Sequence, residues 1–498
     1  MNAIRAGSPT VYLDSPSVSY RRLGEEFAPP RALYVIHFPA ILALSALVSW
    51  IAGTEMAMVA AAGVASVIAL YMLWDWLLRE GPTRLSTLLA LTLLLGYGLG
   101  ALNTWLTLPR GHLSLAAFLG SDEGVLARGM AGVLLSAAPL CFFGELYERP
   151  LFGREFRVPL DQHTYLLVLL GTVATVLGFM TNSLGYMGAQ NVNGELSVPA
   201  ALLSWVFPPL TALTIAIFLA APAGLPKLLT AACALVLLAC LMIVGRRVIV
   251  YAAMETLFAL RLTGYQLKGT VFKKILLLLG LGLTITVGVT VFMLIRLAGF
   301  ENPHDPSSLS LGHRIDTAMG WVNDGTALTR ATEANQTNVQ KRTFVLGFFA
   351  DLLEGSSRRT PGLGHDLFEY AQSTIPRVIY PEKDAFFSEE EYADGLFGLT
   401  YGDAANSILT NGAIDFGLLG VIVYPLLLVA LTRICIEVCS RFLPALPASI
   451  IALGTIFTML ETETGTSGYI VTIRNQIIFA VILFIYSRLP KFQLRRTL

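Results

Sequence analysis

The feature that most constrains this chain is a series of long apolar stretches that continues along most of its length. Twelve such stretches can be read from the sequence. Each is close to the ~20 residues that an α-helix needs to cross a bilayer. Only 14% of the 498 residues are charged, against about 25% in a soluble domain. The sequence therefore predicts an all-α polytopic membrane protein with about twelve transmembrane helices.

The predicted spans are separated by short loops until the ninth, which a long polar loop follows. The seventh and eighth are divided only by Gly245, Arg246 and Arg247. In chain order the stretches cover residues 33–53, 56–78, 86–107, 126–146, 164–184, 200–222, 228–245, 247–263, 274–297, 414–435, 445–462 and 473–489.

The distribution of Lys and Arg predicts the orientation of the chain. Short cytoplasmic loops are enriched in basic residues. The loops 147–162 and 261–274 are both basic, whereas 185–199 holds no Lys or Arg. Two basic loops on the same side require an even number of spans between them, which favours two crossings around Arg246. With the N-terminus inside, the segment 299–413 lies outside.

These boundaries divide the chain into five parts. The first stretch is expected to act as an uncleaved signal anchor, because the N-terminal residues lack the layout of a cleaved signal peptide. The parts are a cytoplasmic segment (1–32), helices one to nine (33–298), a large periplasmic loop (299–413), helices ten to twelve (414–489) and a cytoplasmic tail (490–498).

Several classes of function find no support in the composition or the motifs. A formal net charge of zero gives no overall basic signal for nucleic acid. All five cysteines lie in or beside apolar stretches, so neither a disulfide framework nor a cysteine metal site is predicted. No G-x-G-x-x-G, P-loop or G-x-S-x-G pattern occurs in a suitable context. We therefore expect no cofactor and no metal.

The long loop is the candidate functional region. Loops longer than ~12–15 residues without regular structure are usually functional or disordered. This one carries apolar side chains that favour a packed loop over a disordered one. The apolar residues that we expect to anchor it are Phe344, Phe348, Phe349, Leu367, Phe368 and Ile379.

Four arginines are candidates for binding a phosphate or diphosphate group, because a guanidinium forms bidentate contacts and stays charged. Arg246 and Arg247 are on the predicted outer side, where they can equally be turn residues that reach lipid head groups. Arg377 follows a proline in Ile375–Lys383, so an ordinary stiff loop is its alternative. Arg474 begins the last span, and its alternative is an ion pair with Glu461 or Glu463.

Candidates for a catalytic base lie in the second half of the loop. His365 and Glu369 share one face if their segment is helical, and a histidine beside a carboxylate can accept a proton. A histidine satisfied within the loop is the alternative. Asp403 is a third candidate. Asp415 can simply cap the helix that opens the tenth span.

The segment IPRVIYPEKD, Ile375 to Asp384, resembles a signature of the Wzy-type polymerases of bacterial O-antigen and exopolysaccharide repeat units. Asp384 stands where a second proline is common. The run DAANSILTNGAIDFGLLG, residues 403–420, is similar to their helix entry, and so is Gly245-Arg246-Arg247. The resemblance covers about 240–300 and 340–435. O-antigen ligases share the architecture but carry a His-Asn pair where this chain has Ala405-Asn406.

The resemblance implies a GT-C-like glycosyltransferase in the bacterial inner membrane. Its expected reaction transfers a growing glycan from undecaprenyl diphosphate to the terminal sugar hydroxyl of another lipid-linked repeat unit. Asp403, His365 and Glu369 are the expected base candidates, and Arg246, Arg247, Arg377 and Arg474 the expected diphosphate ligands. Membrane lipids and a chain-length-regulating membrane protein are the further partners expected. The alternatives are a ligase-like transferase, a multi-span transporter or flippase, and a non-catalytic partner in export.

Overall fold

The computed structural model describes residues 32–78, 83–108, 114–119, 121–151, 156–181, 183–184, 198–264, 271–299, 311–330, 345–375, 379–380, 389–400 and 406–488. These residues form helices and connecting loops, and no strand occurs among them.

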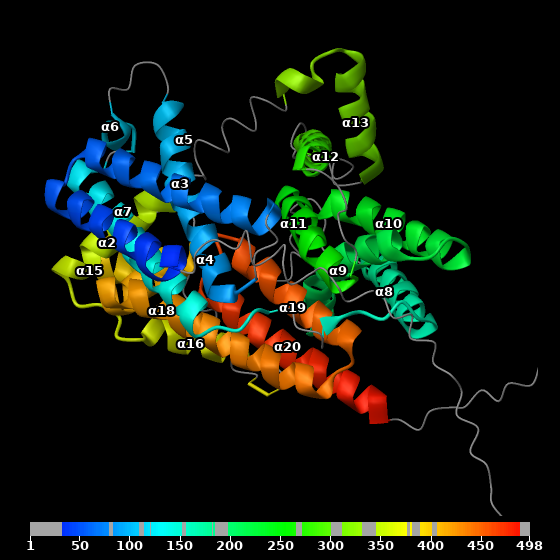
Figure 1. Ribbon diagram of the computed structural model, residues 1–498. Coiled ribbons are helices and arrows are strands. Elements are labelled where there is room, and N and C mark those ends of the chain that lie inside the picture. The colour runs from blue at the N-terminus through cyan, green and yellow to red at the C-terminus, as the bar shows by residue number, and fades with distance from the viewer. Residues whose placement is uncertain are drawn as a thin grey trace, which may run out of the picture.

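Helices cover all twelve predicted stretches (Figure 1). The first combines a π-helical turn with an α-helix, and the third is an α-helix interrupted by a π-helical turn. They are η1 (Leu33–His37) with α2 (Phe38–Ala52), α3 (Glu55–Leu78), α4 (Leu85–Leu93) with η2 (Leu94–Leu99) and α5 (Gly100–Leu106), α7 (Glu123–Leu146), α8 (Gln162–Met180), α9 (Val198–Ala220), α10 (Leu225–Val244), α11 (Arg246–Leu262), α12 (Val271–Ala298), α18 (Ile408–Phe442), α19 (Ala445–Leu460) and α20 (Thr466–Arg488).

Within the described residues, nine of these helices are long and apolar enough to cross a membrane. The prediction of a polytopic membrane protein is thereby confirmed. α19 and the Ile285–Ala298 part of α12 are apolar but shorter. α11 is more polar, because Glu255 and three arginines fall within its 17 residues.

Helix α7 forms the centre of the bundle, where α2, α3, α4 and α18 pack around it. Within the most apolar 18-residue stretch of α7, 78% of the residues are buried. Two glycines make room for α15 (Val345–Arg358), a helix of the long loop. A Cβ on Gly129 would lie 2.5 Å from Cβ of Ala350, and one on Gly132 would lie 3.1 Å from Leu353. The loop is therefore packed into the bundle.

Polar contacts show which helix ends lie together. Arg84 before α4 forms an ion pair of 2.5 Å with Glu145 of α7. The Arg261 guanidinium of α11 donates to the Trp76 carbonyl of α3 at 2.7 Å. Leu262 at the end of α11 accepts from Val158 N, before α8, at 3.0 Å. We call this the Arg84 end.

The opposite end, which we call the loop end, receives the long loop. Arg128 of α7 pairs with Glu354 of α15 at 2.8 Å. Tyr97 Oη lies 2.5 Å from Ser407 Oγ, just before α18. Arg246 starts α11 on this side, because Leu262 at the other end of the helix lies at the Arg84 end.

The described part of the loop is mostly helical. Besides α15 it contains α13 (Leu311–Asn323), α16 (His365–Ser373) and the short α17 (Glu389–Tyr392), which continues into η5 (Ala393–Phe397). A further short helix, α6 (Leu115–Leu119), precedes α7.

Among the predicted loop anchors, Phe348 and Phe349 are buried, and Leu367 packs against the core. Phe368 and Ile379 are wrong as anchors, because their exposed fractions are 61% and 75%. Phe344 lies outside the described residues.

Helix α18 starts at Ile408 rather than 414 and contains a break. Phe416 and Gly417 have non-helical backbone angles, and Gly417 has a φ of 59°. The chain folds back there so closely that a Cβ on Gly412 would lie 2.6 Å from the carbonyl oxygen of Gly420. Glycine is the residue that tolerates the positive φ at position 417 and the close backbone approach at position 412. The Gly-Leu-Leu-Gly run thus separates a short first segment from the long span.

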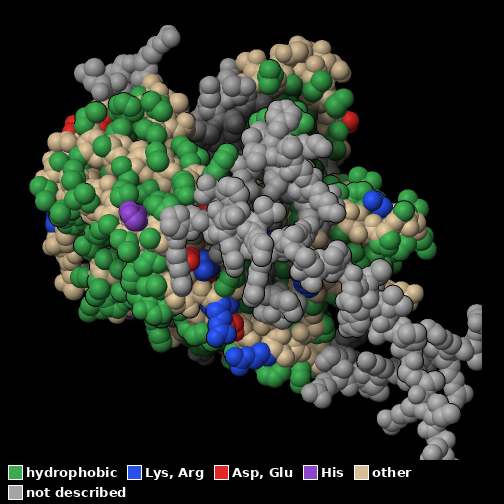
Figure 2. Space-filling view, viewed as in Figure 1, with side chains coloured by type: hydrophobic (Ala, Val, Ile, Leu, Met, Phe, Trp, Pro, Cys, Tyr) green, Lys and Arg blue, Asp and Glu red, His purple; other side chains and the backbone are tan. Residues whose placement is uncertain are grey.

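Hydrophobic side chains are spread widely over the left part of the visible face (Figure 2). Many large apolar residues of the membrane helices are exposed, among them Leu44 at 63% and Val67 at 68%. Apolar surface of this extent is what lipid tails contact, and in a soluble protein it would favour aggregation.

Candidate functional site

The break in α18 is held by the residues that lead into α16. Gly362 N donates to the Ile414 carbonyl and Leu363 N to the Asp415 carbonyl, both at 2.8 Å. A helix break leaves carbonyl groups without their usual partners, and these two bonds satisfy them. The start of α16 is therefore fixed against α18.

The buried carboxylate of Asp415 caps α16. It accepts from Asp366 N at 3.1 Å, from Leu367 N at 3.0 Å and from the Tyr424 hydroxyl at 2.5 Å. The expectation that Asp415 caps its own helix is wrong, because α18 starts earlier and Ser407 is its N-cap. A carboxylate suits a helix N-terminus by charge and by hydrogen bonding.

A second pair of buried side chains extends this network to α20. Asn411 Nδ2 donates to Asp366 Oδ2 at 2.6 Å, and Asn411 Oδ1 accepts from Thr466 N at 2.7 Å. Both side chains are fully buried. The first turns of α16, α18 and α20 are thus joined at the loop end by one hydrogen-bond network.

His365 and Glu369 lie on one face of α16, as their spacing predicts. Nδ1 of His365 is 3.3 Å from Glu369 Oε1 and 3.0 Å from the Tyr392 hydroxyl. Burial raises the pKa of Tyr392, and a hydrogen bond to Glu369 raises it further. Tyr392 therefore stays protonated and can donate a hydrogen bond beside the exposed His365 ring.

Arg474 lies on α20, two turns into the helix. Its guanidinium donates to the Thr374 carbonyl, at the C-terminal end of α16, and to Asn475 Oδ1, with distances of 3.2–3.3 Å. Among the described residues it forms no ion pair with Glu461 or Glu463, so that predicted alternative is wrong. Three of its five N–H groups are used, which leaves two for a ligand.

A pocket of about 310 Å³ opens at the loop end. Its polar lining comes from Asn103 of α5, Tyr251 of α11, and Thr462 and Glu463 in the turn between α19 and α20. Gly96 and Gly100 line the α4–α5 side. Amide, hydroxyl and carboxylate groups beside an aromatic ring are the kind of lining that binds a sugar. We call this the outer pocket.

Arg246 and Arg247 begin the helix that supplies Tyr251. The backbone places Arg246 five residues before Tyr251, or about 7 Å along the helix axis at the rise of an α-helix. The start of α11 is thus close to the outer pocket.

The sequence-predicted residues are not gathered at one point. His365 and Glu369 lie in the first half of α16, whereas Arg474 contacts its C-terminal end, roughly 13 Å away by helical rise. Arg377 and Asp403 lie outside the described residues.

Sequence reasoning missed the outer pocket because its lining comes from separate parts of the chain. Asn103, Tyr251 and Glu463 are more than a hundred residues apart, and no local motif connects them. Tyr392 was missed for the same reason. The sequence signal that could have helped is the conflict between polar side chains and the apolar spans that carry them, as in Asn103 and Tyr251.

Helix α11 also carries a buried carboxyl group that forms no hydrogen bond with any described residue. Glu255 is fully buried, and neither of its side-chain oxygens has a hydrogen-bond partner among the described residues. It is four residues from Tyr251, so it lies one helical turn further from the loop end on the same face.

The arrangement can bind an anionic group at Arg474, hold a polar ligand in the outer pocket and transfer a proton at His365. Among the described residues, no group of three or more His, Cys, Asp or Glu side chains is placed to hold a metal ion. Comparisons with models of known protein families, with curated proteins and with solved structures return no match.

Proposed function

We propose that the chain is a polytopic glycosyltransferase of the bacterial inner membrane that polymerises lipid-linked oligosaccharide repeat units. In this proposal twelve helices cross the membrane in a GT-C-like arrangement with both termini in the cytoplasm, and the loop end faces the periplasm. The substrates are undecaprenyl-diphosphate-linked glycans, and the enzyme requires no cofactor. A chain-length-regulating membrane protein is the proposed protein partner.

One observation carries the proposal beyond the resemblance in sequence. Arg474 is a cation two turns into an apolar span, its hydrogen bonds go to uncharged acceptors, and two N–H groups remain. A cation in such a place is energetically costly and by default marks a functional site. A lipid diphosphate supplies the opposite charge at the depth where the lipid head group meets its apolar tail.

The reaction forms one C–O bond and breaks another. The terminal hydroxyl oxygen of the acceptor repeat unit attacks the anomeric carbon of the donor glycan, and the bond between that carbon and the diphosphate breaks. The polyprenyl diphosphate leaves with the bonding electrons, and the hydroxyl proton passes to a base. Fixed arginines stabilise the charge that develops on the leaving group.

Within this proposal the outer pocket binds sugar hydroxyls of the acceptor. His365, oriented by Glu369 and Tyr392, is the described candidate for the proton acceptor. The segments that hold Arg377 and Asp403 belong to the same loop and remain candidates for the second diphosphate ligand and for the base.

The proposal is tested by the lipid-linked glycans of cells that lack the protein. A polymerase defect leaves single repeat units on the outer leaflet, and polymers return when the gene is restored. Normal polymer in the deleted strain would contradict the proposal.

A transporter is the second candidate, and Glu255 is the observation that favours it. A buried carboxyl group without a partner in a membrane protein is typical of proton-linked transport. In that case the deleted strain accumulates lipid-linked units on the inner leaflet, and Glu255→Gln reproduces the defect. Under the polymerase proposal, Glu255→Gln leaves the leaflet distribution unchanged.

A further inference from the structure

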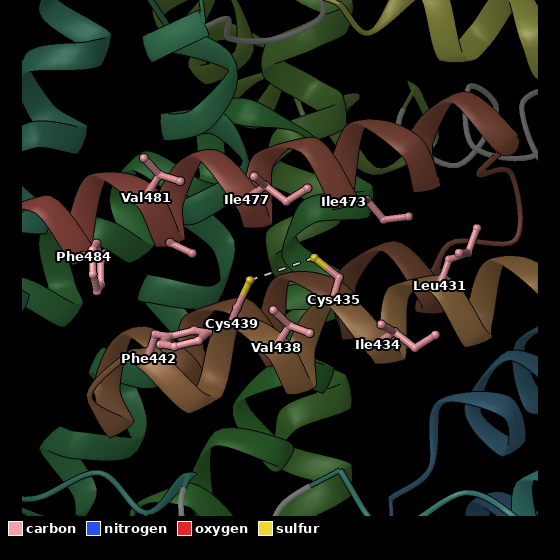
Figure 3. A pocket seen from close by; sticks show the side chains of 11 residues that line it. Leu431, Ile434, Cys435, Val438, Cys439, Phe442, Ile473, Ile477, Val481 and Phe484 are labelled. Atoms are coloured by element: carbon pink, nitrogen blue, oxygen red, sulfur yellow. Dashed lines mark hydrogen bonds between the residues drawn. The ribbon is translucent and has the colours of Figure 1, made fainter.

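An apolar groove of about 510 Å³ runs between α18 and α20 (Figure 3). Leu431, Cys435 and Val438 lie on its α18 side, and Ile473, Ile477 and Val481 lie on its α20 side. The two helices run in the same direction, so Leu431 and Ile473 share one end of the groove in Figure 3. Its lining extends from Ile473 to Phe484, about 16 Å at the helical rise.

The two ends of the groove differ chemically. At the far end, Phe442 and Phe484 pack edge to face with ring centroids 6.5 Å apart. At the loop-facing end, the chain adds a cation next to Ile473. Arg474 is three residues from Ile477 and seven from Val481, so the three share one stripe of α20. Arg474 does not itself line the groove, but this position places its positive charge beside the loop-facing end of an apolar channel.

We propose that this groove binds the isoprenoid tail of a polyprenyl diphosphate lipid, with the diphosphate at Arg474. The identity of the lipid rests on the function proposed above. Charge complementarity supplies the argument, because the guanidinium has two N–H groups left and fits phosphate oxygens by its planar shape.

The shape of the groove favours this lipid over the bulk phospholipids. One groove between two helices takes one chain, whereas a diacyl phospholipid would leave its second chain outside. The head group at Arg474 would touch the end of α16, since Arg474 also contacts the Thr374 carbonyl. Binding the tail would thereby place the diphosphate beside the helix that carries His365 and Glu369.

The chain offers a matched pair of variants. Val481 lines the groove, whereas its neighbour Ile482 does not. Their exposed fractions are 51% and 49%. Val481→Trp fills the groove, and Ile482→Trp places the same ring in the surrounding lipid.

The experiment reconstitutes the full chain in phosphatidylcholine vesicles with a polyprenyl diphosphate that carries diazirines along its isoprenoid tail. We expect photocrosslinks on residues 431–442 and 473–484 that unlabelled polyprenyl diphosphate removes and phosphatidylglycerol does not. Val481→Trp and Arg474→Ala should each lower the crosslinked fraction by about tenfold or more, whereas Ile482→Trp should match wild type.

Crosslinks spread evenly over the exposed membrane helices, equal values for the two tryptophan variants, or competition by phosphatidylglycerol would each overturn the proposal. The same vesicles separate it from the proposed function. Crosslinking in the groove without polymer formation from lipid-linked repeat units refutes only the polymerase. Polymer formation that Val481→Trp leaves unchanged, with no crosslinks in the groove, refutes only the groove.

Discussion

At the scale of single residues, Arg474 is the side chain most important to the proposed function. Its sequence position predicted either a diphosphate ligand or an ion pair with Glu461 or Glu463, and its contacts to Thr374 and Asn475 remove the second alternative. Sequence alone could not decide between the two, because the choice depends on where the C-terminal end of α16 lies. The local pattern could predict the His365–Glu369 face, because i,i+4 spacing in a helix suffices for it.

Substitution of Arg474 separates charge from geometry. Charge-assisted hydrogen bonds contribute ~1.5–3 kcal/mol each, so Arg474→Ala should slow glycan transfer by roughly ten- to a hundredfold. Lysine keeps the charge but lacks the planar fork, so Arg474→Lys should be intermediate. The measurement is the initial rate of polymer formation per folded protein. Arg358→Ala serves as the control, since that side chain is 71% exposed. A wild-type rate for Arg474→Ala would remove this residue from the site.

Tyr392 gives a prediction about alkaline pH. A tyrosine in the unfolded chain loses its proton near pH 10, and the pKa of Tyr392 in the folded protein is higher because it is buried beside Glu369. Above about pH 10 the folded state thus holds one proton more than the unfolded state, and its stability falls as pH rises. In detergent, Tyr392→Phe should lose less melting temperature between pH 9 and pH 11 than wild type. Equal losses would contradict this assignment.

At the scale of elements, the break in α18 is the feature that holds the start of α16 against α18. The apolar stretch predicted a helix there, and a helix is present. The earlier start and the fold-back at Gly417 were not predictable from periodicity. Residues 408–413 mix apolar and polar side chains, and the break depends on contacts with residues 362–367. Asp415 belongs to α18 but caps α16. This contact joins segments that are distant in the sequence, so no local pattern predicts it.

A substitution at Gly420 tests whether the break in α18 is present. A Cβ at this position would overlap the backbone of Gly412, and backbone atoms cannot move aside as a side chain can. Gly420→Ala should therefore lower the melting temperature and the yield of folded protein, since overpacking costs about 1–3 kcal/mol. Gly63→Ala is the matched control, because that position in α3 has open space around it, and alanine favours helix by ~1 kcal/mol. Equal melting temperatures for the two variants would show that the fold-back is absent.

At the scale of the whole molecule, composition and apolar length predicted the membrane-embedded helical fold. Each predicted span is helical, as expected for apolar stretches close to the ~20 residues that a helix needs to cross a bilayer. The sequence could assign each helix end to one side of the membrane, but it could not show which helix ends are neighbours on that side. A hydropathy pattern does not predict which helices pack together. It could therefore predict neither the central position of α7 nor the packing of α15 against the glycines of α7.

Orientation is a prediction for the whole chain, and it follows from the basic short loops. In a variant without the five native cysteines, a cysteine at Ser357, in the loop helix α15, should react with an impermeant thiol reagent from the periplasmic side. A cysteine at Ser440, near the end of α18, should react only after the membrane is opened. The reverse pattern would place the loop end in the cytoplasm.

The central claim is that this one chain joins lipid-linked repeat units. The most direct measurement incubates the purified wild-type protein in liposomes with undecaprenyl-diphosphate-linked repeat units and resolves the products by length. The account predicts a ladder of polymers on the lipid, with release of one polyprenyl diphosphate for each unit added. A substrate that stays a single repeat unit in the presence of folded wild-type protein, under conditions where the lipid is accessible to it, would contradict the account.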